Sequence, residues 1–132
     1  MSEKQFTLDE ARRLVPWLQG TFDDLAPLRN RVRQLNMEID GLLDRMRSNG
    51  GSDAEEGLGL HRRALSEASE ALADGLRPVL ERGIVVRSVD RALVDFPSMR
   101  AGRQVYLCWI DGEKDVDFWH ELDTGFARRQ PL

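Results

Sequence analysis

The stretch QVYLCWIDGEKDVDFWHELDTGF, residues 104–126, holds most of the chemically distinctive side chains of this chain. It contains two of the three Trp, the only Tyr, the only Cys and one of the two His. Residues 104–110 are rich in β-branched and aromatic side chains, as in a strand. Asp111-Gly112 is a turn signal, and residues 116–121 fit a second strand that runs back along the first. This order predicts a β-hairpin of two antiparallel strands.

The first strand of this hairpin is apolar on both faces, with Val105, Leu107 and Trp109 on one side and Tyr106, Cys108 and Ile110 on the other. A half-buried antiparallel strand normally alternates apolar with polar residues. A helical layer can cover one face. We expect a second copy of the chain to cover part of the other face, and we therefore predict a homodimer.

Two more strands are predicted upstream, at residues 84–87 and 92–96, because both runs are β-branched or apolar and Asp90-Arg91 separates them. We expect Pro97 to end the second run and residues 98–103 to form a loop. The sheet then has about four antiparallel strands over residues 84–121, and residues 122–132 form a tail.

The N-terminal part predicts a long antiparallel helical hairpin over residues 7–82. Thr7-Leu8-Asp9-Glu10 is a capping box for its start. From Leu25 onward the apolar spacing alternates three and four, which is typical of a coiled-coil seam, and a second seam runs from Leu65 to Val79. Pro16 predicts a kink or break near Val15, and Pro27 raises the same expectation again.

The polar, glycine-rich stretch of residues 48–57 predicts a mobile loop at the tip of this hairpin. Its Gly50-Gly51 pair could cradle a phosphate, but the Lys and Ser/Thr of a P-loop are absent, so we favour a linker. The expected fold is α+β: one domain over residues 1–132, helical hairpin first and antiparallel sheet second.

Composition narrows the functional classes. The net charge of −4 gives no general reason to expect nucleic acid or an anionic membrane as a partner. One Cys excludes an internal disulfide and suits a reducing compartment. No apolar run is long enough for a membrane span, and no apolar segment follows the first charges as in a signal peptide. We expect a cytoplasmic protein.

Five segments in order resemble a known prokaryotic family, domain of unknown function 2203: FTLDEA (residues 6–11), LVDFP (93–97), VYLCW (105–109), FWHELD (118–123) and GFARRQPL (125–132). The similarity covers nearly the whole chain, and Phe118 fits the family's habit of an aromatic residue before Trp119. The family has no assigned activity and no agreed catalytic residues, so the resemblance implies no function.

The cluster of His120, Glu121 and Asp123 is the most suggestive for chemistry, since a carboxylate can orient a His that acts as a base or a metal ligand. On a strand, however, neighbouring residues face opposite sides, so His120 and Glu121 cannot chelate one ion within a subunit. His61 lies in the other half of the chain, and ligand spacing for zinc is absent. We favour a structural His and expect no metal and no cofactor.

Other candidates have equally plain structural alternatives. Cys108 could be a nucleophile beside His120, but between Leu107 and Trp109 we favour a small buried hydrophobe. Asp95 could be a carboxylate of shifted pKa, or it could accept hydrogen bonds before Pro97 or pair with Arg103. The aromatic residues favour core or interface packing over base stacking, because the hairpin is acidic.

Two functions of different class remain open. The first is a non-enzymatic dimeric domain that binds a protein partner or a small ligand through the hairpin of residues 104–126. The second is a small hydrolase or isomerase with His120 as the base and Glu121, Asp123 or Asp95 contributed at a dimer-interface cleft. The candidate binding residues are Asp95, Arg103, Tyr106, Trp109, Trp119, His120, Glu121 and Asp123.

Overall fold

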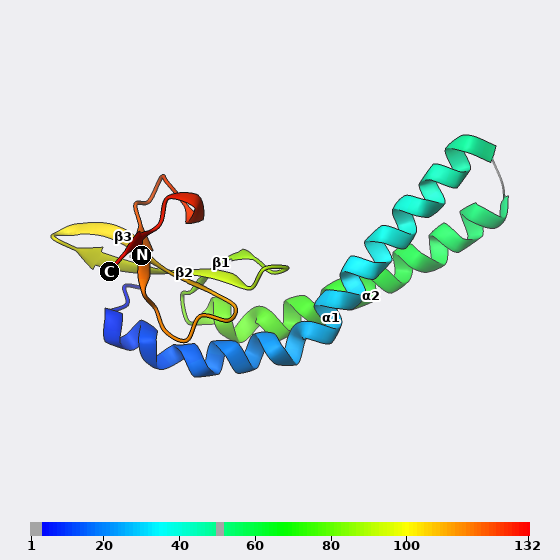
Figure 1. Cartoon of the computed structure of the whole chain (residues 1–132). Coiled ribbons are helices and arrows are strands. Elements are labelled where there is room, and N and C mark those ends of the chain that lie inside the picture. Colours follow the sequence, from blue (N-terminus) through cyan, green and yellow to red (C-terminus); the bar gives the residue numbers. More distant parts are fainter. Residues whose placement is uncertain (1–3, 50–51) are drawn as a thin grey trace. The chain divides into compact units, whose positions relative to one another are not determined.

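The protein is described by a computed structural model over residues 4–49 and 52–132. Two helices come first and an antiparallel sheet follows, which confirms the α+β class (Figure 1). The helices are α1 (Leu8–Asn49) and α2 (Ser52–Glu81), and the strands are β1 (Val85–Ser88), β2 (Leu93–Arg100), β3 (Arg103–Ile110), β4 (Phe118–His120) and β5 (Gln130–Pro131). A short 3₁₀ helix, Phe126–Arg128, precedes β5.

The chain forms two compact units. The hairpin unit is Leu25–Gly75 and consists of the middle and end of α1 with most of α2. The sheet unit comprises Met1–Asp24 and Leu76–Leu132, and so holds the sheet, the start of α1 and the end of α2.

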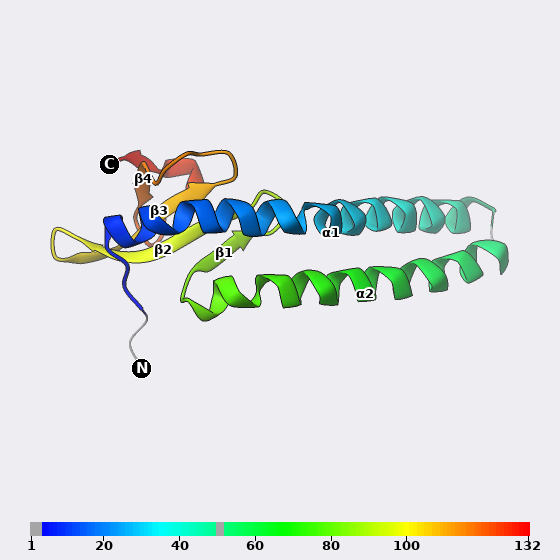
Figure 2. The same cartoon turned by 90° about the horizontal axis from the view of Figure 1, so that it is seen from below.

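In the hairpin unit, α1 and α2 lie side by side and antiparallel, as the two seams predict (Figure 2). Ile39, Leu42 and Leu58 are buried together, and Leu43, Met46, Ala54 and Leu65 pack against them. The apolar seam is therefore buried within one chain, which supplies most of the stability of long helices in water.

The break between the helices is shorter than we predicted. α1 continues to Asn49 and α2 begins at Ser52, so helix replaces most of the loop expected over residues 48–57. Ala54 and Leu58 pack on the seam of α1, and this packing favours helix over the local turn preference of the polar residues. The Gly50-Gly51 pair lies outside the described residues.

We predicted a kink or a break near Val15, and the break is wrong, because α1 runs without interruption past Pro16 and Pro27. A proline inside a helix removes one backbone hydrogen bond and strains the turn before it. Around Pro16 this cost is opposed by burial, because Val15, Leu18 and Phe22 are all in the core of the sheet unit.

The helices of the hairpin approach closely where α2 has Gly75. A Cβ atom at Gly75 would meet the Leu25 side chain well inside van der Waals contact, whereas a Cβ at Gly59 would meet nothing within 4 Å. We expect Gly75→Ala to lower the free energy of unfolding by about 1–2 kcal/mol, because overpacking outweighs the better helix propensity of Ala. Urea unfolding followed by circular dichroism measures this change.

Gly59→Ala is the matched control for that substitution, since both glycines lie in α2. We expect it to raise stability by up to about 1 kcal/mol through helix propensity alone. Equal effects of the two substitutions would contradict the close approach at Leu25.

The sheet has the strand order β1-β2-β3-β4-β5 with every pair antiparallel, so each strand lies beside its neighbours in the chain. One face carries Val94, Phe96, Val105, Leu107, Trp109 and Trp119. The start of α1 and the segment before it pack on this face: the Phe22 ring lies 6.3 Å from that of Trp109, and Phe6, just before the helix, packs edge-on against Phe96 at 5.2 Å. The capping box is formed, with Thr7 and Glu10 bonded reciprocally at 3.0 and 3.1 Å.

Two expectations about β2 are wrong. The strand runs through Pro97 to Arg100, and the expected loop 98–103 shrinks to the two-residue turn Ala101-Gly102, both at positive φ. The Pro97 carbonyl accepts from the Phe6 N–H, so the proline nitrogen points to the same open side of β2, beyond the end of β1. Proline is tolerated there because no ladder hydrogen bond is lost.

The second face of the sheet carries Asp95, Tyr106, Cys108, Phe118 and His120. The C-terminal segment covers part of it, since the Arg129 guanidinium lies 4.0 Å from the centre of the Phe118 ring. Part of the segment that we expected to be a tail is strand β5, which pairs with β4. Some of the cover that we assigned to a second copy thus comes from the chain itself.

Candidate functional site

The centre of the candidate site is a buried carboxylate–imidazole pair. Asp95 on β2 and His120 on β4 both point to the second face, and β3 between them aligns both strands. Asp95 Oδ1 lies 3.0 Å from His120 Nε2, and each residue is 2% exposed. Burial of such a pair is tolerated only when both partners are present and their other polar atoms are satisfied.

The second oxygen of Asp95 is held by an arginine. Arg87 Nε donates to Asp95 Oδ2 at 2.9 Å, and the guanidinium lies 4.8 Å from the centre of the Tyr106 ring. Burial acts to lower the pKa of Arg87, but the hydrogen bond and charge of Asp95 outweigh it and raise that pKa above its usual value. Arg87 therefore carries a permanent positive charge beside the buried pair.

The other ring nitrogen of His120 is also engaged. Nδ1 lies 2.7 Å from the Glu121 carbonyl oxygen, which can only accept, so Nδ1 carries a hydrogen and donates it. Nε2 is the nitrogen that shares a proton with Asp95. Neither nitrogen is free for a substrate in this arrangement, although a general base needs an accessible lone pair within hydrogen-bond reach.

Cys108 on β3 lies next to the pair and is fully buried. Burial, and then the charge of Asp95, raise the pKa of its thiol to about 12, although Arg129, with Nη1 3.9 Å from the sulfur, acts in the opposite direction. A thiol with this pKa is not a thiolate at neutral pH, so the Cys108 nucleophile hypothesis gains no support.

Our expectation that Asp95 pairs with Arg103 is wrong, because the two side chains lie on opposite faces of the sheet. Arg103 instead forms an ion pair with Glu121. As predicted, Glu121 and His120 point to opposite faces, and Glu121 is therefore separate from the site.

The aromatic candidates are divided between the two faces. Trp109 belongs to the core under α1, where its Nε1 donates to the Glu113 carbonyl at 2.9 Å. Trp119 is buried on the same face beneath the Arg100 guanidinium, whereas Tyr106 lies on the second face, with its ring 5.5 Å from that of His120.

A pocket of about 320 Å³ opens beside the buried pair. Asp95 and His120 form part of its wall, together with Arg87, Leu93 and the segment from Leu122 to Phe126, which includes Asp123. Arg87 was not among the candidate residues expected from the sequence. Arg87 is the polar residue that ends the apolar run Ile84-Val85-Val86, and the bulge in β1 obscures the face of the sheet on which it lies.

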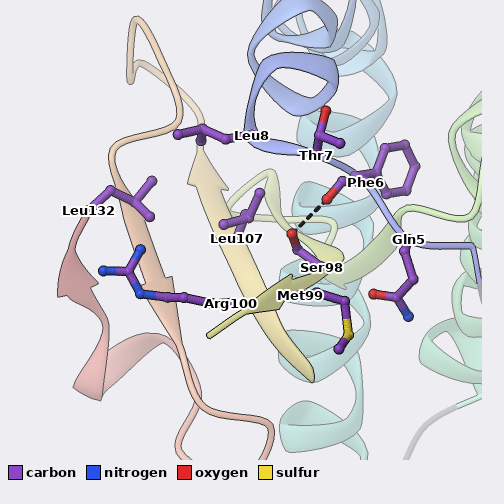
Figure 3. A pocket seen from close by; sticks show the side chains of 9 residues that line it. All are labelled: Gln5, Phe6, Thr7, Leu8, Ser98, Met99, Arg100, Leu107 and Leu132. Carbon is purple, nitrogen blue, oxygen red and sulfur yellow. Dashed lines mark hydrogen bonds between the residues drawn. The ribbon is translucent and has the colours of Figure 1, made fainter. Parts of the chain in front are cut away.

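A second pocket of about 310 Å³ lies near the start of α1 and has a mainly apolar lining of Leu8, Leu107, Met99 and Leu132 (Figure 3). The Ser98 hydroxyl at its edge donates to the Phe6 carbonyl at 2.6 Å, which ties β2 to the N-terminal segment. None of the residues that the sequence nominated lines this pocket.

Across the described ranges 4–49 and 52–132, no helix combines the length and the apolar character that a membrane span requires.

Comparison with known proteins gives one match. Residues 4–132 match the model of a family described as an uncharacterized conserved protein, DUF2203. No curated protein matches the chain significantly, and no solved structure does so either. Since the match spans nearly the whole sequence, the chain belongs to the DUF2203 family.

Proposed function

We propose that this protein is a non-enzymatic binding domain that holds a small anionic molecule with an apolar part in the pocket beside Asp95 and His120. The observation that carries the proposal is the position of Arg87. Its Nε is anchored on the buried Asp95, while 43% of the side chain remains exposed where the pocket opens. A guanidinium fixed in this way presents its remaining N–H groups to a carboxylate or phosphate.

The rest of the lining supports such a ligand. Leu93, Leu122 and Phe126 supply apolar contacts, and the volume of about 320 Å³ suits a small molecule. The guanidinium groups of Arg91 and Arg129 lie 4.6 and 4.4 Å from the centre of the Phe126 ring. Two more cations are therefore next to this wall of the pocket. Asp123, which also lines the pocket, is exposed, and its negative charge acts against the binding of an anion.

Sodium benzoate is a suitable probe, because it combines one carboxylate with one ring. In NMR titrations of the ¹⁵N-labelled protein with EDTA present, we expect benzoate to shift the amide signals of Leu93, Asp95 and residues 120–126. Benzyl alcohol, which lacks the charge, should bind at least tenfold more weakly, since a charge-assisted hydrogen bond contributes about 1.5–3 kcal/mol.

Arg87→Gln should weaken benzoate binding by roughly tenfold or more, and Arg87→Lys should retain part of it. Arg103→Gln is the matched control, because Arg103 also pairs with a single carboxylate but lies on the other face. The proposal fails if benzoate shifts no pocket signal, or if both glutamine variants weaken binding equally.

The hydrolase or isomerase alternative is favoured by one observation, the convergence of Asp95 and His120 at 3.0 Å. For catalysis, His120 would have to release one of its two present partners. If the wild-type protein cleaves p-nitrophenyl acetate and His120→Gln does not, while His61→Gln does, the alternative is supported. If the three proteins cleave the ester equally, or none of them does, the alternative loses that support.

We also propose that the domain acts as a cytoplasmic homodimer with coiled-coil-like helices. Met37 and Leu60 are 68% and 60% exposed in the hairpin unit, and both are large apolar side chains available for a helical partner. The single Cys, buried as a thiol, fits a reducing compartment. Light scattering after gel filtration should give twice the chain mass of 15.1 kDa. A measured mass equal to that of one chain would contradict the proposed homodimer.

A further inference from the structure

Three residues with different metal-ligating groups meet on the second face of the sheet. One ligand atom each from Asp95, Cys108 and His120 lies within 4.8 Å of the other two, and all three residues are buried. They come from three adjacent strands, β2, β3 and β4, so the sheet holds their backbones in fixed register. A carboxylate, a thiolate and an imidazole are together the ligand types that Zn²⁺ prefers.

We propose that Asp95, Cys108 and His120 form a binding site for a divalent transition metal ion of the zinc type. This inference does not depend on the proposed binding of an anion.

The immediate surroundings of each residue orient it for this role. The Nδ1–H of His120 donates to the Glu121 carbonyl, which leaves Nε2, the nitrogen facing Asp95, as the ligand atom. Arg87 holds Oδ2 of Asp95, and Oδ1 is left for the ion. Ligating His and carboxylate groups typically have such outer partners, which fix their orientation.

Cys108 has an outer partner as well. Arg129 Nη1 lies 3.9 Å from its sulfur, and the same nitrogen is 3.0 Å from Glu113 Oε1. An N–H group directed at the sulfur stabilises a thiolate once the proton has left. All three candidate ligands therefore have oriented partners before an ion is added.

The spacing requires only small movements. Bond lengths of about 2.0–2.3 Å and tetrahedral angles place ligand atoms roughly 3.3–3.6 Å apart. The three ligand atoms now lie within 4.8 Å of one another, so the longest separation must shorten by about 1 Å. Rotation of the side chains can supply this movement. Asp95 and His120 also line the pocket, so an entering ion reaches two ligands directly, and a fourth position can be filled from the pocket.

The net charge does not oppose the ion. Binding displaces the thiol proton of Cys108 and the proton shared by Asp95 and His120, so two protons leave as two positive charges enter. The nearby cations Arg87 and Arg129 therefore face the same net charge with and without the ion. Direct coordination then replaces hydrogen bonds within the cluster.

Cobalt(II) is the most direct probe, because a bond from thiolate to Co²⁺ gives a near-ultraviolet charge-transfer band. The chain has one Cys, so any such band reports Cys108. Protein stripped with EDTA and returned to chelator-free buffer should develop this band at one Co²⁺ per chain, with visible bands of tetrahedral intensity. Zn²⁺ should then abolish both.

Variants assign the other two ligands. Cys108→Ser should lose the charge-transfer band, while His120→Asn and Asp95→Asn should each weaken Co²⁺ binding by tenfold or more. His61→Gln is the matched control, since His61 pairs with Glu38 in the hairpin unit, and it should bind as the wild type does. Far-UV circular dichroism of each variant shows whether it is folded.

Absence of the band in the wild-type protein overturns the proposal without any variant, as does a band that His120→Asn leaves unchanged in a folded protein. Because the benzoate titration is made in EDTA, its outcome is independent of the metal. Each proposal is therefore tested by its own experiment, and the failure of one does not contradict the other.

Discussion

Replacing Asp95 by Ala is expected to lower the free energy of unfolding by about 3–5 kcal/mol. The carboxylate is 2% exposed and is the partner of both His120 Nε2 and Arg87 Nε. Its removal leaves the buried imidazole nitrogen of His120 without its partner and the Arg87 guanidinium without its counter-charge, and a buried polar group left unpaired costs free energy. Urea unfolding in EDTA, followed by far-UV circular dichroism, measures the loss.

Glu121→Ala is the matched control, because Glu121 also pairs with one arginine but its ion pair with Arg103 is solvent-exposed. We expect less than about 1 kcal/mol for that substitution. A double variant, Asp95→Ala with His120→Ala, should lose less than the sum of the two single losses, because the second change removes the group that the first left unpaired. A loss at Asp95 no larger than at Glu121 would show that the pair is not buried.

Trp109→Ala is the second large effect, with an expected loss of about 3–5 kcal/mol. The side chain is fully buried, its ring centre lies 6.3 Å from that of Phe22 on α1, and its indole N–H donates to the Glu113 carbonyl at 2.9 Å. Truncation opens a cavity between helix and sheet and leaves that carbonyl without its donor. Because domains are stable by only about 5–15 kcal/mol, the variant should be marginal at room temperature.

Trp17→Ala provides the comparison for Trp109. Trp17 lies on α1 in the same unit, but it is only half-buried, with the Arg82 guanidinium 4.1 Å from its ring centre. We expect a loss of about 1 kcal/mol, the contribution of an exposed cation–π contact. Circular dichroism rather than fluorescence is the readout, since both substitutions remove an indole. Similar losses at the two positions would contradict the assignment of Trp109 to the core.

The two faces of the sheet therefore have separate roles. The face beneath α1 carries Trp109 and the large apolar side chains, and it holds the sheet unit together. The second face carries ionisable groups in a partly covered setting, and both proposals concern this face. Variants of the first face should change stability, whereas variants of the second face should also change ligand or metal binding.

Much of the fold was determined by the sequence itself. The capping box at Thr7, the apolar seams of the helices and the β-branched and aromatic strand of residues 104–110 are local patterns, and each folds as predicted. Local patterns failed at prolines and polar stretches. Pro16 and Pro97 do not end their elements, and residues 52–57 are helical, because packing or an open strand edge offsets the local preference.

The sequence also placed Asp95, Cys108 and His120 among the residues with possible chemistry, and it correctly separated His120 from Glu121 by the alternation of a strand. It named Asp95 only as one of three possible partners of His120, because the two residues are 25 apart in the chain and no periodicity relates residues on different strands. It could not find Arg87, because a bulge in β1 breaks the alternation there. The register of β2, β3 and β4 is a tertiary property, and it alone decided that a carboxylate, a thiol and an imidazole meet at one point beside a pocket.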